Sequence, residues 1–199
     1  MKTLLFSFFL LLGLAACESG PATSAPAAGT VATPLDGFTT TPITGTDYVL
    51  AEKRNADGKL VESGRLRGDV KDGAWVTYHP DSEVPATVAD YVNGNFSGTY
   101  QTFNTRGQLE MIASYINNQL HGKYAKYKFG RKTEEGEYLN GQQTGTWIEY
   151  FNNKDQPQKL QTFANGKLNG PFRYYDEEGN VTLEYDYKDG EKVSGGIVQ

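Results

Sequence analysis

The chain is poor in the residues that build catalytic and metal centres, because its 199 residues include one Cys and two His. A single Cys leaves no partner for an internal disulfide and excludes every metal site that needs several thiolates. Basic residues are outnumbered, with 19 Lys and Arg against 24 Asp and Glu, and they form no run of five or six. Nucleic acids are bound through such basic surfaces, so no nucleic-acid partner is expected.

The common catalytic motifs are missing as well, since the sequence has no Gly-x-Ser-x-Gly and no His-Glu-x-x-His. His79 and His121 lie 42 positions apart without the third ligand that a zinc site needs. Two acidic groups are candidates for the carboxylate pair of a glycan hydrolase, Glu134-Glu135-Glu137 and Asp176-Glu177-Glu178. Charges in hairpin loops more often keep strand edges soluble. We therefore expect no catalytic residues, no metal and no cofactor.

Residues 1–16 have the layout of a secretory signal peptide. Lys2 is followed by an apolar run from Leu4 to Leu14 and then by small residues. This run is too short to span a bilayer, which takes about 20 apolar residues. The segment is predicted to direct export and to take no part in the fold.

The end of this segment, Leu14-Ala15-Ala16-Cys17, resembles the lipobox of bacterial lipoproteins. The resemblance implies cleavage before Cys17 and a diacylglyceryl group on its sulfur, so that the lipid bilayer holds the protein through several acyl chains. The alternative is ordinary cleavage near a Cys that is there by chance. Glu18 stands where an Asp would signal retention in the inner membrane, so the resemblance favours a bacterial envelope protein of the outer membrane.

Residues 17–44 are dominated by Ala, Thr, Pro, Gly and Ser, and they hold Pro21, Pro26, Pro34 and Pro42. They show no alternation of apolar and polar residues that could bury a face. We interpret them as a disordered tether between anchor and domain. The alternative is that part of this stretch packs onto the domain through Phe38.

Residues 45–199 repeat one pattern, aromatic-x-Asn-Gly-x-x-x-Gly-x-aromatic-x-x-aromatic. Its first positions are Leu66 in a degenerate copy, Tyr91, Tyr115, Tyr138 and Phe163, with a truncated copy from Tyr187. The twelve residues from first to last position never vary, for example from Tyr91 to Phe103, whereas the connecting halves range from 11 to 13. Because loops tolerate insertions and paired strands do not, the variable half must contain a loop. Asn-Gly is itself a strong signal for a two-residue hairpin turn.

This repeat resembles the MORN family, in particular its bacterial variant with the Asn-Gly-x-x-x-Gly-x-aromatic core. The sequence departs from the family at Asn118 and Asp69, where a turn glycine or asparagine is replaced. The resemblance implies an all-β fold, an elongated single-sheet meander of five to six hairpin repeats. The final Gly195-Gly196-Ile197-Val198 predicts an apolar edge that a partner or a second copy could cover.

Aromatic residues must supply much of the core, because residues 45–199 hold 24 Leu, Val, Ile and Met against 21 aromatics. Rings three positions apart on a strand face opposite sides unless a bulge intervenes, so one set can be exposed. The structural interpretation makes one ring set the core, and the functional one makes it a binding stripe. Both apply to the same five residues, Trp75, Tyr100, Tyr124, Trp147 and Phe172.

Three functions are compatible with these features. The first is a lipid-anchored, non-catalytic binding or scaffold module for a protein or a glycan of the envelope. The second is an inhibitor of a toxin, since some bacterial members of the resembled family are antitoxins, although a lipoprotein address suits a cytoplasmic antidote poorly. The third is a glycan hydrolase that uses the loop carboxylates. We favour the binding module, because it uses the tether and the repeat and needs no catalytic set.

Overall fold

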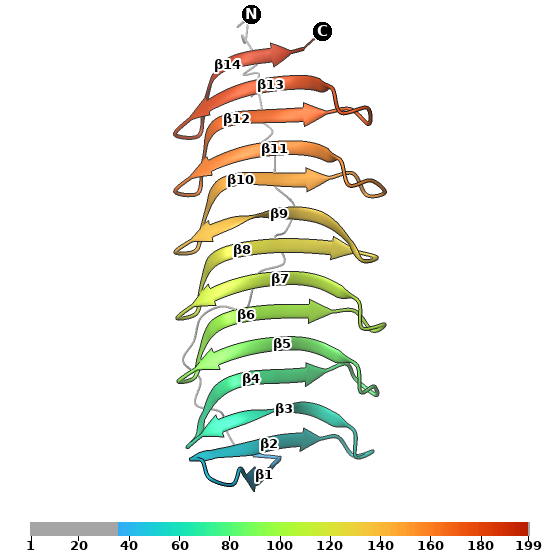
Figure 1. The fold of residues 1–199 in the computed structure, drawn as a ribbon, viewed down its shortest axis with the longest axis vertical. Coiled ribbons are helices and arrows are strands. Elements are labelled where there is room, and N and C mark those ends of the chain that lie inside the picture. Colours follow the sequence, from blue (N-terminus) through green and yellow to red (C-terminus); the bar gives the residue numbers. More distant parts are fainter. Residues whose placement is uncertain (1–35, 199) are drawn as a thin grey trace, which may run out of the picture.

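Residues 36–198 are described by a computed structural model, and they form one open sheet of fourteen antiparallel strands in chain order (Figure 1). The strands are β1 Phe38–Pro42, β2 Tyr48–Arg54, β3 Leu60–Arg67, β4 Val70–Tyr78, β5 Pro85–Val92, β6 Asn95–Phe103, β7 Leu109–Ile116, β8 Gln119–Lys128, β9 Arg131–Leu139, β10 Gln142–Tyr150, β11 Pro157–Ala164, β12 Lys167–Tyr175, β13 Val181–Lys188 and β14 Glu191–Ile197. The predicted all-β meander of hairpin repeats is confirmed. Residues 36–198 contain no helix that is long and apolar enough to cross a membrane.

The sheet begins earlier than predicted. β1 lies inside the segment interpreted as a tether, 17–44, and pairs with β2 along its whole length. The Phe38 ring packs on Trp75 with 5.9 Å between ring centroids. The boundary at residue 45 is therefore wrong, and the alternative in which Phe38 packs onto the domain is confirmed. The signal peptide, Cys17 and the tether as far as residue 35 lie outside the described residues.

Two-residue turns join β3–β4, β5–β6, β7–β8, β9–β10, β11–β12 and β13–β14 along one edge of the sheet, on the left in Figure 1. Asn93 and Gly94 have φ of 49° and 79°, the two positive values that a type I′ turn requires. Asn118 replaces the glycine without changing the turn, because Asn also adopts the left-handed region, here with φ of 67°. At Gly68-Asp69 only the first residue has positive φ, as in a type II′ turn.

The opposite edge carries the longer connections, as the variable spacing predicted. Five of them have five or six residues, namely 55–59, 79–84, 104–108, 151–156 and 176–180, whereas β8 and β9 are joined by Phe129 and Gly130 alone. The five-residue loops share one arrangement. The side chains of Asn55, Asn104 and Asp176 each accept hydrogen bonds from the N–H groups two and four residues later.

A bulge interrupts each two-residue hairpin. In β7–β8, Ala113 opposes Tyr124 and Tyr115 opposes Leu120, so three residues of β8 face one residue of β7. Gly122 lies in this extra segment with φ of 101°, a backbone conformation that favours glycine. Bulges bend strands, and the strands are visibly curved in Figure 1. The fixed glycine of the repeat therefore marks the bend.

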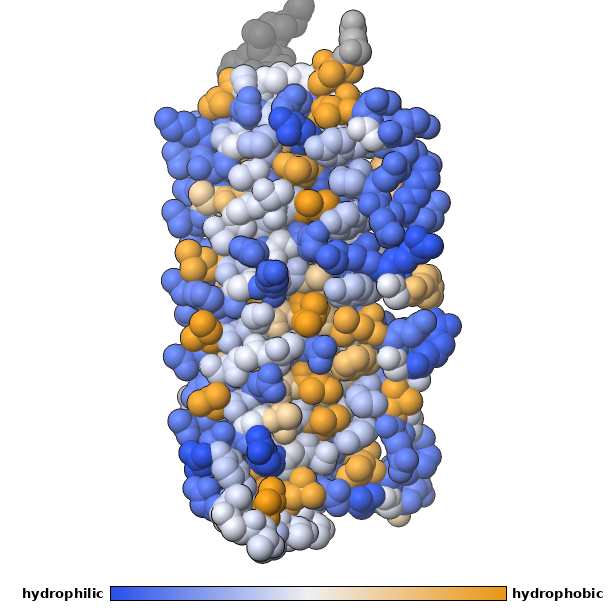
Figure 2. Space-filling view, in the orientation of Figure 1, coloured by the Kyte–Doolittle hydropathy of each residue, from blue (hydrophilic) through white to orange (hydrophobic). Residues whose placement is uncertain are grey.

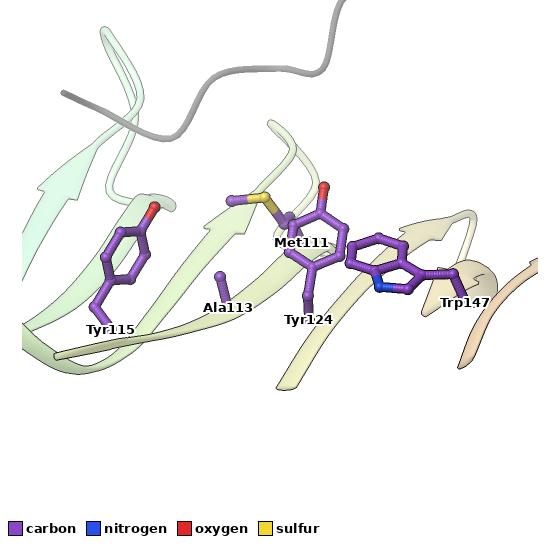
Figure 3. Packing of buried hydrophobic residues seen from close by; sticks show 5 residues of the cluster. All are labelled: Met111, Ala113, Tyr115, Tyr124 and Trp147. Carbon is purple, nitrogen blue, oxygen red and sulfur yellow. The ribbon is translucent and has the colours of Figure 1, made fainter. Parts of the chain in front are cut away.

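The core lies on one side of the sheet. Five of its buried residues, Met111, Ala113, Tyr115, Tyr124 and Trp147, project to the same side (Figure 3). A second buried cluster, Ala51, Leu66 and Trp75, contacts Phe38, Val49 and Tyr91 near the first strands. We call this side the ring face and the opposite side the open face.

Candidate functional site

The five rings predicted as core or binding stripe lie in one row across the ring face, each on an even-numbered strand. The residue opposite each ring on the odd-numbered strands is small for most of the row, as at Gly64, Ala89 and Ala113. The rings lean over these small residues, because a Cβ at Gly64 or Gly136 would overlap the indole of Trp75 or Trp147. Large and small side chains therefore alternate from strand to strand.

Burial divides these five rings. Trp75, Tyr124 and Trp147 are 2%, 8% and 3% exposed and are core residues. Tyr138 packs edge-on against Trp147 with 5.1 Å between ring centroids. Tyr100 and Phe172 are half-buried. A ligand could reach only the last two without opening the core, so the row as a whole is not an accessible stripe.

The last ring of each repeat faces the other way. Tyr78 shares a hydrogen bond of 3.3 Å between its hydroxyl and Ser63 Oγ, and Ser63 follows the side opposite Gly64 and Trp75. The Tyr150 hydroxyl likewise donates to Glu135, on the side opposite Trp147. The members of this second ring set are all half-buried on the open face: Tyr78, Phe103, Tyr127, Tyr150 and Tyr175. The expectation of two ring sets on opposite faces is confirmed.

The open face is hollowed between β6 and β10 by a groove of about 700 Å³. Its floor is apolar and consists of Ile112, Ala125 and Ile148, which lie side by side on β7, β8 and β10 with Tyr127 at one end. Figure 2 shows the corresponding face of the molecule, where hydrophobic side chains run in a broken column along the long axis between hydrophilic margins. The groove is the largest recess found among the described residues.

Polar groups surround this floor: Thr99, Ser114, Lys123, Lys132, Glu135, Glu137 and Thr146. Lys123 and Glu137 are opposed across β8 and β9, and both are exposed. Cross-strand pairs of opposite charge usually attract. Within residues 36–198, however, neither side chain takes part in an ion pair or a side-chain hydrogen bond. Both remain available to a ligand, as do the hydroxyls of Thr99 and Thr146.

The glutamates proposed as a hydrolytic pair are divided between the two faces. Glu134 pairs with Lys126 at 2.9 Å on the ring face. Glu135 lies on the open face, where the Lys132 ammonium at 2.5 Å and the Tyr150 hydroxyl hold its pKa below the usual value. A glycosidase acid must keep its proton near neutral pH and needs a raised pKa. The geometry therefore gives Glu135 a structural role, and burial together with this bond raises the pKa of Tyr150 to about 12.

The second acidic group is also engaged. The Asn180 side-chain amide and the loop N–H groups lower the pKa of Asp176 by stabilising its charged form. Glu177 pairs with Lys154 at 2.6 Å. Two histidines stand apart at loop and strand positions, with His79 Nε2 2.8 Å from the Phe103 carbonyl oxygen and His121 Nδ1 3.2 Å from Asn140 Oδ1. In the described part of the chain, no three His, Cys, Asp or Glu residues come together to hold a metal.

Comparison with models of known protein families gave no match, and neither did a search of curated proteins. The groove was not predicted from the sequence. Its floor residues alternate with the ring positions along each strand, for example Ile112 before Ala113, but they follow no shared residue pattern. Their periodicity of two was the available signal, because every second residue must lie on the face opposite the rings.

Proposed function

We propose that the protein is an envelope-anchored, non-catalytic module that binds an extended protein or polymer in the groove of its open face. The observation that supports this most directly is the groove itself, with an apolar floor beside one cation, one carboxylate and several hydroxyls that have no side-chain partner. Binding sites combine apolar surface with a few convergent polar groups in this way. The MORN-like repeat agrees, because stacked repeats create extended surfaces.

The length of the sheet favours an elongated ligand. The strands are stacked in one row, and neighbouring strands in a sheet lie about 4.8 Å apart. The groove runs over β6 to β10, and the apolar row continues beyond it through Val88 on β5 and Leu160 on β11. A compact ligand would fill the groove alone, whereas a chain or polymer could also contact the adjoining row.

The binding test uses the full chain in detergent-solubilised envelope fractions. Thr146 is exposed at the groove, so Thr146→Arg would fill the groove with a large charged side chain and leave the core unchanged. Thr39→Arg, at an exposed position of β1 outside the groove, is the matched control. We expect a bound component with the native chain and Thr39→Arg that is absent with Thr146→Arg. Identical bound material in all three would contradict the assignment to the groove.

The proposed anchor is tested separately. Acylation of Cys17 predicts that the native chain fractionates with membranes and that Cys17→Ser releases it, because about 0.8 kcal/mol per buried CH₂ holds the acyl chains in the bilayer. Mass spectrometry of the N-terminal peptide identifies the modification. A Cys17→Ser protein that stays with the membrane through a salt wash would show that something other than the lipid holds it.

A further inference from the structure

The connection between β8 and β9 breaks the rule of its edge. The other five connections on that edge have five or six residues, whereas this one consists of Phe129 and Gly130. The two residues have φ of 53° and 77°, so the turn is of type I′. The edge therefore contains one position where the chain turns back at once.

Phe129 is an unusual residue for this position. In the six two-residue turns of the opposite edge, the first residue with positive φ is Gly68, Asn93, Asn117, Asn140, Asn165 or Asp189. These types enter the left-handed region at low cost, whereas a bulky side chain there is strained. The strain is not repaid by burial, since Phe129 is 69% exposed. A ring kept at a strained and exposed position points to a role outside the fold.

Cations lie around this ring. Arg106 Cζ is 5.7 Å and Lys128 Nζ is 6.0 Å from the ring centroid of Phe129. Between the 104–108 loop and this turn lies a recess of about 410 Å³, lined also by Asn104, Thr105, Glu110 and Tyr127. Among the described residues, no carboxylate forms an ion pair with Arg106 or Lys128. The recess thus combines an exposed ring with two cations that lack a counter-charge.

We infer that this recess, which we call the Phe129 notch, binds an acidic segment of a protein partner. A guanidinium matches a carboxylate in shape and charge, and Lys128 adds a second positive charge. Exposed aromatic and Arg side chains are the usual anchors of protein interfaces. The notch is distinct from the proposed groove, although Tyr127 borders both. The inference stands whether or not the groove binds a ligand.

Two other anionic ligands fit less well. A sugar ring stacks flat on an aromatic face, but Arg106 and Lys128 already lie over the Phe129 ring. A bilayer would meet the neighbouring loops too, and these carry exposed acids such as Asp155, whose side chain is 86% exposed, and Glu177. A short acidic segment touches only the notch and avoids this repulsion.

The experiment measures binding of a fluorescent octapeptide of alternating Glu and Leu to the full chain at low ionic strength. The matched probe has Gln in place of every Glu. We expect saturable binding of the Glu peptide, at least a tenfold loss of affinity for Phe129→Asn and for Arg106→Glu, and no comparable binding of the Gln peptide. Phe129→Asn should melt at the same or a higher temperature, because Asn tolerates this backbone conformation.

Controls separate the notch from general charge and general apolar surface. Lys167→Glu makes the same change in charge at an exposed position of the opposite edge, and Ile116→Asn removes an exposed apolar side chain there. Both should bind the Glu peptide like the native chain. Equal losses in the controls, unchanged binding by Phe129→Asn, or a lowered melting temperature of that variant would overturn the inference. So would binding of anionic phospholipid vesicles or polygalacturonate, rather than the peptide, that depends on Phe129.

Discussion

The two halves of the ring face are built from the same repeat, yet only one of them is closed. From β2 to β10 the ring face holds nine of the ten buried apolar residues, including Trp75, Tyr124 and Trp147. In β11 to β14, which the structure describes completely, no residue is buried, although Phe172, Tyr174, Tyr185 and Tyr187 bring four rings together. The number of rings therefore does not decide whether the sheet has a core.

The small residues between the rings account for the difference. In the first region the strands between the rings offer Gly64, Ala89, Ala113 and Gly136, and each ring leans over one of them. In the second region Gln161 and Tyr185 occupy the equivalent positions beside Phe172. A ring cannot settle onto the sheet over a large side chain, so the rings there stay half-exposed. Close packing in a single-layer sheet thus requires alternating size as well as hydrophobicity.

The largest expected effect comes from removing equivalent rings from the two regions. Trp147→Ala should lower the free energy of unfolding by about 3–5 kcal/mol, because it leaves a cavity in the core. Phe172→Ala should cost only about 1–2 kcal/mol, since its ring is half-exposed before the change. Urea denaturation of both variants measures the two losses. Equal losses would mean that the second region is as closed as the first.

Adding one carbon to the small positions should have the next largest effect. Gly136 has no positive φ, so Gly136→Ala adds no backbone strain, but its new Cβ would overlap the Trp147 ring. Such overpacking costs about 1–3 kcal/mol. At the equivalent position of the second region, Gln161→Ala should change stability by less than about 1 kcal/mol or improve it, because the Phe172 ring gains room. A Gly136→Ala variant as stable as the native chain would refute the size rule.

Sequence periodicity predicted the fold because the repeat fixes hairpin length. The invariant twelve residues of each copy correspond to a two-residue turn flanked by paired strands, and the variable half contains the longer loop. It could not assign β1, since Phe38–Pro42 has one ring among Thr and Pro and shows no alternation. An edge strand needs contacts on one side only, and here the packing of Phe38 on Trp75 supplies them.

The candidate site was less accessible to sequence reasoning. The repeat marks the rings, and most of those rings serve packing, so the pattern pointed to the ring face. The groove depends on Ile112, Ala125 and Ile148, which differ from copy to copy because the fold places few demands on the open face. The Phe129 notch depends on a single shortened connection and appeared in the spacing only as the 11-residue interval from Tyr127 to Tyr138.

Alkaline pH should weaken the closed region selectively. Burial raises the pKa of Tyr91, Tyr115 and Tyr138 to about 12 from a model value of 10.0, because ionised phenols are poorly solvated in the core. The unfolded chain loses these protons from pH 10 upward while the folded chain keeps them, so stability is intact below pH 10 and falls as pH approaches 12. Tyrosinate absorbance, followed alongside hydrogen exchange of β5 to β9, measures this loss. Tyrosines that ionise near pH 10 without loss of protection would contradict the burial argument.

The smallest expected effect concerns one oxygen in the closed region. The Tyr115 hydroxyl is buried and has no hydrogen-bond partner in the structure of residues 36–198. A buried polar group without a partner costs about 1–3 kcal/mol, so Tyr115→Phe should leave stability unchanged or raise it by about 1 kcal/mol. Tyr150→Phe is the matched control on the open face, where the hydroxyl donates to Glu135, and it should lose about 1 kcal/mol. Opposite signs in urea denaturation would show that the ring face selects Tyr115 for its ring alone. A loss at Tyr115 as large as that at Tyr150 would instead mean that its hydroxyl has a partner in solution.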